Sequence, residues 1–319
     1  MKLGVAVVTH DSADVITECL TRVTSLLPDT RVCVVDNDSG DATLSRAAAV
    51  SPLVDTLSSG GNRGYAAACN LAFGYFEDCG VELVLVLNPD VLLVAATEAA
   101  LGSAFGDPQT NHVVGVEAGT GAPFLAAATP NSFEMLRYSV LLVLPPRLAR
   151  SAVRAFCPSG TAMHASGALL AVRTAAWRSV GGFDEDYFLY YEDRDLSERL
   201  QKCGALGISM GVRGMHFQGG SSTAPTGFSL RSALSGWLMY VAKHDGRAAA
   251  RLWCARTATV QRLVLAALVL PAALGSTRAA RKKSELRLAA AFLRSGLDDS
   301  LVTSDPPSRT LRRALQWGC

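Results

Sequence analysis

Three carboxylates stand close together at Glu192, Asp193 and Asp195, directly after the aromatic run that extends from Tyr187 to Tyr191. Leucines at helical spacing follow, so the sequence predicts a helix that begins at this acidic segment. Acids in a first helical turn also suit the helix dipole, and that purely structural interpretation stays open. Aromatic surface beside a carboxylate removes water from it and raises its pKa, as a general base requires. The segment is therefore a candidate catalytic site.

The elements before this segment alternate between apolar runs and helical patterns. Strands are predicted over 3–9, 31–35, 53–57, 82–87, 167–172 and 206–212, and helices over 13–27, 41–50, 65–79, 97–106 and 174–180. The stretch 117–133 is rich in Gly, Ala, Pro and Thr and predicts a loop. The pattern as a whole predicts an α/β fold with a mostly parallel sheet flanked by helices.

Polar residues cluster just past the ends of the first four predicted strands. Open α/β sheets bind ligands at the carboxyl ends of their strands, so these residues are candidates for ligand binding. They are Thr9, Asp11, Asp36, Asn37, Asn62, Arg63, Gly64, Asn88 and Asp90.

Charge is divided unevenly along the chain. Residues 1–230 carry 15 Lys and Arg and 23 Asp and Glu, a net charge of −8, whereas residues 231–319 carry 15 and 5, a net charge of +10. A basic C-terminal region favours an anionic partner such as lipid headgroups or a phosphorylated acceptor, although a basic helical surface without a partner also explains it. The apolar run 263–275 is shorter than the ~20 residues of a membrane span, so it fits an interfacial helix or packing onto the protein.

The eight cysteines form no CxxC pair and lie mostly in apolar stretches. This usage is typical of reduced cytosolic thiols rather than of a disulfide framework or a zinc site. The apolar run 3–8 is too short for the core of a signal peptide. A cytoplasmic protein is therefore expected, and peripheral contact with the inner face of a membrane stays open.

Six motifs stand in an order that resembles the family 2 glycosyltransferases with a GT-A fold, especially their rhamnosyltransferase-like branch. They are Val7 to Thr9, Val34 to Ser39, Gly61 to Asn70, Leu87 to Asp90, Gly181 to Asp184, and Tyr191 to Leu196. The resemblance covers roughly residues 1–225. It implies a catalytic domain over 1–228, with a nucleotide-sugar half to about residue 95 and an acceptor half after it. Beyond residue 228 the composition shifts to Ala, Leu and Arg with helical periodicity, so a helical, basic C-terminal region is expected over 229–319.

The resemblance also implies inverting transfer of a sugar from a nucleoside diphosphate to an acceptor hydroxyl. Asp193 matches the base that deprotonates the acceptor, and Glu192 would orient its neighbours. Asp36 matches the residue that accepts from a pyrimidine N–H, although Asp-Asn-Asp-Ser-Gly is equally a turn sequence. Thr9, Asp11, Asn37, Asn62, Arg63 and Gly64 would line the donor crevice.

A divalent cation, Mg²⁺ or Mn²⁺, is implied by the Asn88-Pro89-Asp90 motif, in which Asn88 replaces the first acid of the family's metal motif. Asp90 would hold the ion together with the donor phosphates, and His216 would add an imidazole ligand. A lone histidine is more often structural, so that alternative stays open. The segment 219–222 resembles a loop that orders over bound donor.

The resemblance implies rhamnose or another deoxysugar carried on dTDP or UDP, and a glycan, lipid-linked or small-molecule acceptor. No nucleic-acid partner is expected, and a homodimer stays open. A dinucleotide dehydrogenase would carry GxGxxG after the first strand, and a sugar-phosphate nucleotidyltransferase would carry a glycine-rich basic loop there; the chain has neither. A non-catalytic nucleotide-sugar-binding protein is a further alternative, against which the intact set Asp36, Asp90 and Asp193 argues.

Overall fold

The computed structural model of the chain describes residues 2–127, 163–216, 226–267 and 287. It divides into two compact units, one formed by residues 1–126 with 164–223 and the other by 127–163 with 224–319. All the candidate site residues belong to the first unit. The functional division expected at residue 228 stays a prediction.

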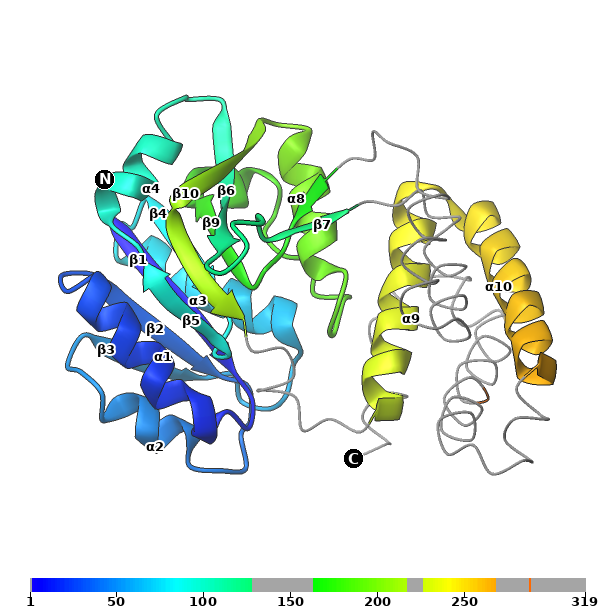
Figure 1. The fold of residues 1–319 in the computed structure, drawn as a ribbon, viewed down its shortest axis with the longest axis horizontal. Coiled ribbons are helices and arrows are strands. Elements are labelled where there is room, and N and C mark those ends of the chain that lie inside the picture. Colours follow the sequence, from blue (N-terminus) through cyan, green and yellow to red (C-terminus); the bar gives the residue numbers. More distant parts are fainter. Residues whose placement is uncertain (1, 128–162, 217–225, 268–286, 288–319) are drawn as a thin grey trace. The chain divides into compact units, whose positions relative to one another are not determined.

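The first unit is built on an eight-stranded sheet in the order β3-β2-β1-β4-β9-β6-β10-β5 (Figure 1). The pairs β1–β2, β2–β3, β1–β4 and β6–β10 are parallel, and β4–β9, β6–β9 and β10–β5 are antiparallel. The expected mostly parallel α/β sheet is thus confirmed, with antiparallel pairing confined to its second half. The strands are β1 (Leu3–Thr9), β2 (Arg31–Asp36), β3 (Val54–Ser58), β4 (Leu83–Leu87), β5 (Val91–Ala95), β6 (Thr110–Glu117), β9 (Leu169–Arg173) and β10 (Ala205–His216).

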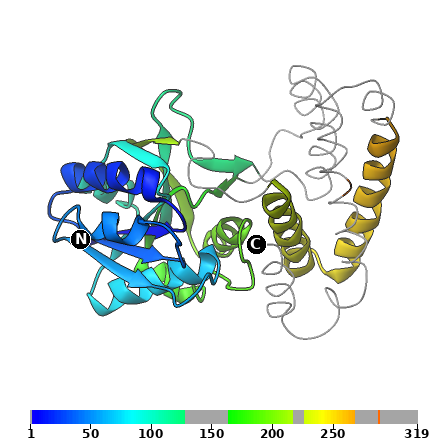
Figure 2. The ribbon, with the colours of Figure 1, turned by 90° about the horizontal axis from the view of Figure 1, so that it is seen from below.

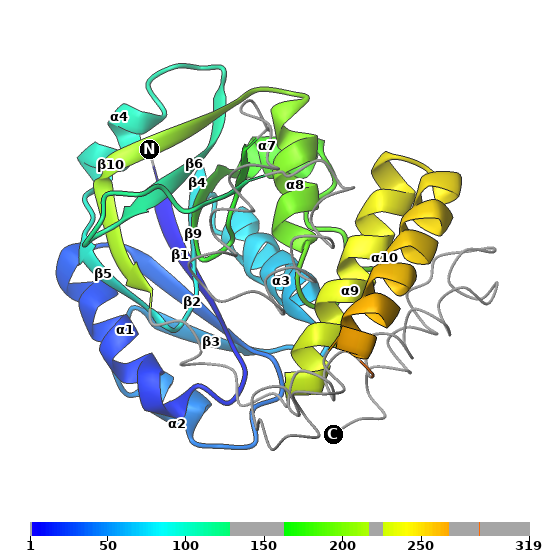
Figure 3. The ribbon, with the colours of Figure 1, turned by 45° about the vertical axis from the view of Figure 1, so that its right-hand side comes forward.

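Helices cover both faces of the sheet, because its strands are apolar on both sides. Leu3, Val5 and Val7 of β1 belong to the core on the face that α1 and α4 cover, whereas Ala6 and Val8 belong to the core on the face that α3 and α8 cover. Figure 3 shows α1 and α3 on opposite faces. The helices of this unit are α1 (Ala13–Leu26), α2 (Thr43–Ala48), α3 (Tyr65–Asp78), α4 (Glu98–Ala104), α7 (Thr174–Ser179) and α8 (Glu192–Gln201).

The structure has strands in parts of the chain where the sequence pattern predicted none. Strand β5 begins at Val91, directly after Asp90. Strand β6 begins with Thr110, Asn111 and His112, which are polar and nevertheless buried. The prediction of a loop over 117–133 is wrong for Leu125–Ala127, which forms strand β7 and pairs with β8 (Met163–Ala165). The strand expected over 206–212 is longer, and a register shift between Ile208 and Arg213 interrupts its pairing.

The described part of the second unit contains α9 (Thr226–His244) and α10 (Arg247–Ala267), which lie side by side (Figure 2). Gly246, with φ +92°, makes the turn between them, a conformation that suits glycine. The helical periodicity expected beyond residue 228 is therefore confirmed over this part. Within the described residues, we find no helix that combines the length and apolar character of a membrane span. The segments 134–155 and 219–222 and most of 263–275 lie outside the described residues.

Candidate active site

The parallel strands β1, β2 and β3 bring their carboxyl ends to one edge of the sheet. Thr9 pairs with Asp36, and Asp36 pairs with Ser58, so the loops after these strands begin at the same level. This edge is where open α/β sheets bind ligands. The structure thus brings Thr9 and Asp36 together as the sequence predicted.

The loop after β4 meets the loop before β9 at this same edge. Leu87 of β4 pairs with Leu169 of the antiparallel β9, and the backbone N–H of Asn88 donates to Ala168 O at 3.1 Å. Because β9 runs against β4, its beginning lies beside the end of β4. The segment around Gly167 therefore joins the edge that holds Thr9 and Asn88.

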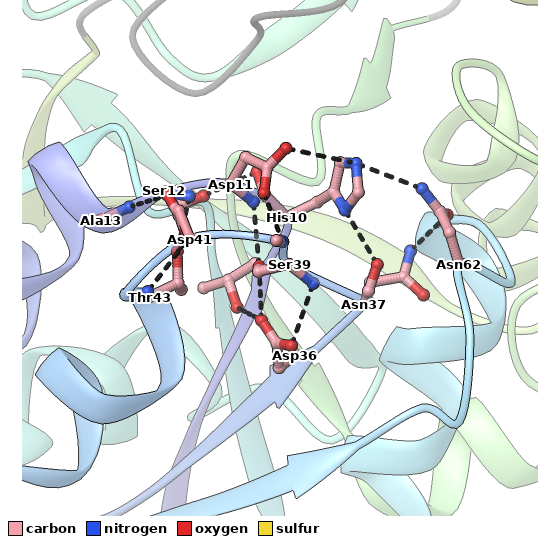
Figure 4. A network of polar contacts seen from close by, with 12 residues as sticks. His10, Asp11, Ser12, Ala13, Asp36, Asn37, Ser39, Asp41, Thr43 and Asn62 are labelled. Carbon is pink, nitrogen blue, oxygen red and sulfur yellow. Dashed lines mark hydrogen bonds and ion pairs between the residues drawn. The ribbon is translucent and has the colours of Figure 1, made fainter. Parts of the chain in front are cut away.

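Asp36 is buried and its carboxylate is already bonded within the protein (Figure 4). Oδ1 accepts from Thr9 Oγ1 at 3.1 Å and from Ser39 Oγ at 2.6 Å, and Oδ2 accepts from Ser39 N at 3.1 Å. These bonds are those of an Asx-type turn, the structural alternative open at this residue. A carboxylate offers about four lone-pair positions, so one remains for a ligand N–H.

Asp11 extends this turn towards the surface. It has φ +47°, and its Oδ1 accepts from Gly40 N at 2.8 Å, while its own N–H donates to Ser39 Oγ at 2.9 Å. Asp11 and Asp36 are thus tied to one turn through Ser39, from the loop after β1 and the end of β2 (Figure 4).

Asn37 joins the turn after β2 to the glycine-rich loop that precedes α3. Its Nδ2 donates to Asn62 Oδ1 at 2.9 Å, and its Oδ1 accepts from Arg63 N at 3.0 Å and from Ser59 Oγ at 3.0 Å. His10 completes the group, because its Nδ1 lies 2.9 Å from Asn37 O and must donate to that carbonyl. The predicted residues Asn37, Asn62 and Arg63 therefore form one bonded unit.

Asp90 and His216 supply the donor pair expected for a cation. Asp90 Oδ1 lies 3.5 Å from His216 Nε2, because Val91, next to Asp90, pairs with His216 at the end of β10. One carboxylate oxygen and one imidazole nitrogen fit a divalent cation such as Mn²⁺. Among the described residues, no cluster of three or more His, Cys, Asp or Glu side chains could hold a metal alone. The remaining ligands would have to come from a diphosphate or water.

Asp193 lies in the first turn of α8 and reaches back to the sheet edge. Its Oδ2 accepts from Gly167 N at 2.9 Å, and its Oδ1 accepts from Arg194 N at 2.7 Å. Burial raises the pKa of Asp193, and these two N–H groups and the charge of Arg194 oppose that rise. The result is a desolvated carboxylate held in a fixed orientation, which suits a base.

Glu192 immediately precedes Asp193, but within the described part of the chain its carboxyl group lacks comparable hydrogen-bond donors. It is buried, and no partner bonds its Oε2 among the described residues. Burial raises the pKa of Glu192 well above its ordinary value, and the charge of Asp193 adds to the rise. The pKa values of both carboxyl groups are therefore raised, and Glu192 is the better site for a shared proton because Asp193 has the N–H donors.

The segment that leads into α8 is docked on the beginning of α3. Tyr65 N donates to Phe188 O at 2.8 Å, and a Cβ at Gly64 would lie only 2.5 Å from that oxygen. Asn70 binds both backbone groups of Phe183, with its Oδ1 2.9 Å from the N–H and its Nδ2 2.9 Å from the carbonyl. The motif Gly61 to Asn70 thus serves as the platform for the acidic helix.

Two further contacts fix the side chains around this platform. Arg63, expected near the donor, lies 3.4 Å from Glu185 Oε2 across the two loops. Asp195 forms an ion pair with Arg199, in which Arg199 Nη2 lies 2.6 Å from Asp195 Oδ2. This carboxylate is therefore engaged within the protein and is not available to a ligand. Tyr190 and Tyr191 precede α8 with φ of +70° and +74°, so two non-glycine residues turn the chain sharply into the helix.

Sequence reasoning missed the roles of Tyr65, Asn70 and Gly167. Asn70 gave a signal, since it is a polar residue amid the Ala, Cys and Phe of the buried face of α3. Gly167 gave none, because its contact with Asp193 joins residues from separate elements.

The fold is that of the GT-A glycosyltransferases, and the comparisons with known proteins agree. Residues 4–94 match the family described as Glycosyl transferase family 2. The curated N-acetylglucosaminyl-diphospho-decaprenol L-rhamnosyltransferases of two Mycobacterium tuberculosis strains are each 31% identical over 211 residues. The match covers 56% of this chain and 62% of each relative, so it spans less than two thirds of their length. The expected resemblance to the family 2 glycosyltransferases, and to a rhamnosyltransferase among them, is thereby confirmed.

Solved structures support the fold. A mannosyltransferase from Pyrobaculum calidifontis, PcManGT, in complex with GDP-Man and Mn²⁺, has a TM-score of 0.53 at 18% identity, with 95% of this chain and 88% of that chain covered. GalNAc-T7 with UDP, GalNAc and Mn²⁺ has a TM-score of 0.54 at 14% identity, with 76% and 47% covered. At these identities the likeness concerns the fold alone.

Proposed function

We propose that this protein is an inverting glycosyltransferase that moves a sugar from a nucleoside diphosphate to an acceptor hydroxyl. The observation that carries the proposal is the position of Asp193. Its carboxylate is bonded to Gly167 N, next to Ala168, whose carbonyl binds the N–H of Asn88. The candidate base thus belongs to the same sheet edge as the Asn88-Pro89-Asp90 loop and the Asp36 turn.

In the proposed reaction the acceptor oxygen forms a bond to the anomeric carbon while the bond from that carbon to the diphosphate oxygen breaks. Asp193 takes the proton of the acceptor hydroxyl, and the nucleoside diphosphate leaves with the bonding electrons. Attack from the face opposite the leaving group inverts the configuration, as in the inverting glycosidases that use a carboxylate base. Burial raises the pKa of Glu192 well above its ordinary value, so Glu192 takes up a proton more readily than Asp193 and limits the negative charge beside it.

The donor would lie along the carboxyl edge, with Thr9, Asp11, Asp36 and the Asn37–Asn62 unit lining its nucleotide part. Asp90 and His216 would hold a divalent cation, Mg²⁺ or Mn²⁺. Such an ion offsets the charge that develops on the leaving diphosphate.

The curated relatives are named as L-rhamnosyltransferases that act on a lipid-linked acceptor, N-acetylglucosaminyl-diphospho-decaprenol. This supports rhamnose or another deoxysugar as the transferred group and a lipid-linked saccharide as the acceptor, on dTDP or UDP. A cytoplasmic protein with peripheral contact at the inner face of a membrane is part of the proposal, since the basic C-terminal region is suited to anionic headgroups.

A thermal-shift series with dTDP, UDP and GDP, each with and without Mn²⁺, tests the proposal. A ligand at 100 times its Kd stabilises the native state by about 2.7 kcal/mol, which raises the melting temperature by roughly 5–10 °C. We expect dTDP or UDP to stabilise the protein, and Mn²⁺ to add to the shift. The control is Asp90→Asn, which should keep the metal-free shift and lose the increment.

Release of the nucleoside diphosphate from matched sugar donors then separates an enzyme from a binding protein. Stabilisation by nucleotide without release from any donor and acceptor pair would favour the non-catalytic alternative. No stabilisation by any nucleotide would contradict the proposal as a whole.

A further inference from the structure

Tyr65, the first residue of α3, lies between two loops that carry the candidate chemistry. Its hydroxyl oxygen is 3.0 Å from Asn88 Oδ1 and 3.1 Å from Gly167 O. The N–H of Gly167 in turn donates to Asp193 Oδ2 at 2.9 Å. One hydroxyl thus connects the loop that contains Asp90 with the residue that binds the base.

We propose that Tyr65 is a positioning residue, which clamps Gly167 so that Asp193 is held at a fixed place relative to the Asn88-Pro89-Asp90 loop. This inference rests on the proposed function, because it assigns a role in the transfer reaction. Tyr65 itself would touch neither the sugar nor the nucleotide.

Gly167 needs such a clamp because a glycine has more backbone freedom than any other residue. It is held at its N–H by Asp193 and at its carbonyl by Tyr65. A Cβ at this position would lie 3.4 Å from both Asp193 Cβ and the Tyr65 hydroxyl oxygen, so the three residues are in direct contact. Without the hydroxyl, one of the two bonds that fix Gly167 is lost.

The Tyr65 hydroxyl has only one hydrogen to donate, and this explains why an asparagine suits position 88. The Tyr65 hydroxyl has one hydrogen, and the Gly167 carbonyl can only accept it. The Tyr65 oxygen then faces Asn88 with a lone pair. The structure places Asn88 Oδ1 there, and a flip of the amide would present its Nδ2 as a donor to the hydroxyl oxygen instead. A carboxylate at position 88 could only accept and would compete with Gly167 for the same hydrogen. The amide in place of the first acid therefore belongs to the clamp.

The clamp also affects the proton affinity of the base. The Gly167 N–H favours the ionised form of Asp193, whereas burial raises the pKa of Asp193. The other titratable or charged groups that act on or respond to Asp193 are Glu192 and Arg194 on its own helix and Tyr65 and Cys69 on α3. Weakening the Gly167 bond removes a stabilising donor, so the pKa of Asp193 rises.

Tyr65→Phe removes the hydroxyl and keeps the ring that packs edge-on against Phe183. We expect kcat to fall about 10-fold to 100-fold, the range in which small misplacements of a reacting group act. The donor KM should stay within about twofold, because nucleotide contacts are untouched. The acid limb of the kcat–pH profile should move to higher pH, since the base is protonated over a wider range.

Tyr75→Phe is the matched control, because Tyr75 lies in the same helix and its hydroxyl binds Asp55 and Arg31 at a distance from the site. It should change the melting temperature alone, with the kcat and pH profile of the parent. Asn88→Asp, which cannot donate to the Tyr65 oxygen, should move the acid limb in the same direction as Tyr65→Phe. It serves as the second test if Tyr65→Phe fails to fold.

A Tyr65→Phe protein with the parent's kcat and acid limb would overturn the inference while leaving the proposed function intact. A parent protein that binds nucleotide and releases none would overturn the proposed function itself, and the inference with it. A fall in kcat equal in both tyrosine variants, with no movement of the acid limb, would also overturn the inference, because it would reflect a general loss of stability.

Discussion

The two carboxylates Asp36 and Asp193 lie at one edge of the sheet in different surroundings. Asp36 receives bonds from Thr9 Oγ1, Ser39 Oγ and Ser39 N, which all lie within its own turn or the neighbouring strand. Asp193 has two backbone N–H donors and a buried acid, Glu192, beside it, and its pKa is raised by burial. One carboxylate has three of its about four lone-pair positions occupied by the protein, and the other is desolvated and restrained.

This difference indicates a division of labour between the two halves of the site. A carboxylate with three internal donors contributes first to the stability of its own turn, which would shape the nucleotide pocket. A carboxylate whose proton affinity is raised accepts a proton more readily, as a base must. Removing the charge of Asp193 should therefore lower kcat, whereas removing that of Asp36 should first lower the stability of the protein.

The largest effect is expected for Asp193→Asn. The amide keeps the size and one acceptor oxygen, but it cannot take a proton, so kcat should fall by about 10²-fold to 10⁴-fold. Nucleotide affinity and melting temperature should stay near the parent's values, as measured by titration and thermal shift. Asp14→Asn, at a fully exposed position on α1, is the control and should have the parent's kcat. Full turnover by Asp193→Asn would assign the base to another residue.

Asp36→Asn should affect stability first. The amide nitrogen would face a Ser39 donor, so one buried group loses its partner at a cost of about 1–3 kcal/mol. Chemical denaturation measures this loss. Asp38→Asn is the matched control, because Asp38 is exposed with φ +69°, a conformation that asparagine tolerates. If Asp36→Asn kept the parent's stability and lost only nucleotide binding, the turn would not be the main role of this carboxylate.

The smallest effect at neutral pH is expected for Glu192→Gln, and it depends on pH. Burial raises the pKa of Glu192, so above the ordinary glutamate pKa the folded protein keeps a proton that the unfolded chain has lost. Stability therefore falls as the pH rises from there towards the raised pKa. The glutamine variant lacks this titration and should melt above the parent at neutral pH and level with it near about pH 4.

Glu18→Gln, on the exposed face of α1, is the control for Glu192→Gln and should follow the parent at every pH. The kcat–pH profile gives a second reading. Glu192 is not among the causes of the raised pKa of Asp193, which are burial opposed by backbone N–H donors and Arg194, so the acid limb should stay in place. A limb that moves to lower pH would mean that Glu192 carries a charge while Asp193 titrates.

The sequence predicted the parallel half of the fold well, because β1 to β4 are short apolar runs with helices between them. The sequence did not predict the strand β6, because its first residues are polar although they are buried. His112 is fully buried in β6, where burial lowers its pKa to about 4 and Ser197 Oγ lies 3.2 Å from its Nε2. No local pattern predicts that a Thr-Asn-His run becomes a central strand, since the partners that satisfy it come from α8.

The sequence predicted the acidic residues of the candidate site but not the residues that bind them. Asp36, Asp90 and Asp193 follow strand ends or open a helix, and sequence patterns reveal such positions. The contact between Tyr65 and Gly167 depends on β9 running antiparallel beside β4, so it needed the topology.

The left-handed pair Tyr190 and Tyr191 has a consequence for how the chain can change. Together they fix the residue at which α8 begins, since left-handed backbone ends any continuation of the helix towards its N-terminus. Each residue of an α-helix advances about 100° around its axis. An insertion or deletion of one residue after Tyr191 would therefore swing the carboxylate of Asp193 to another side of the helix, which makes indels here more damaging than any single exchange of side chain.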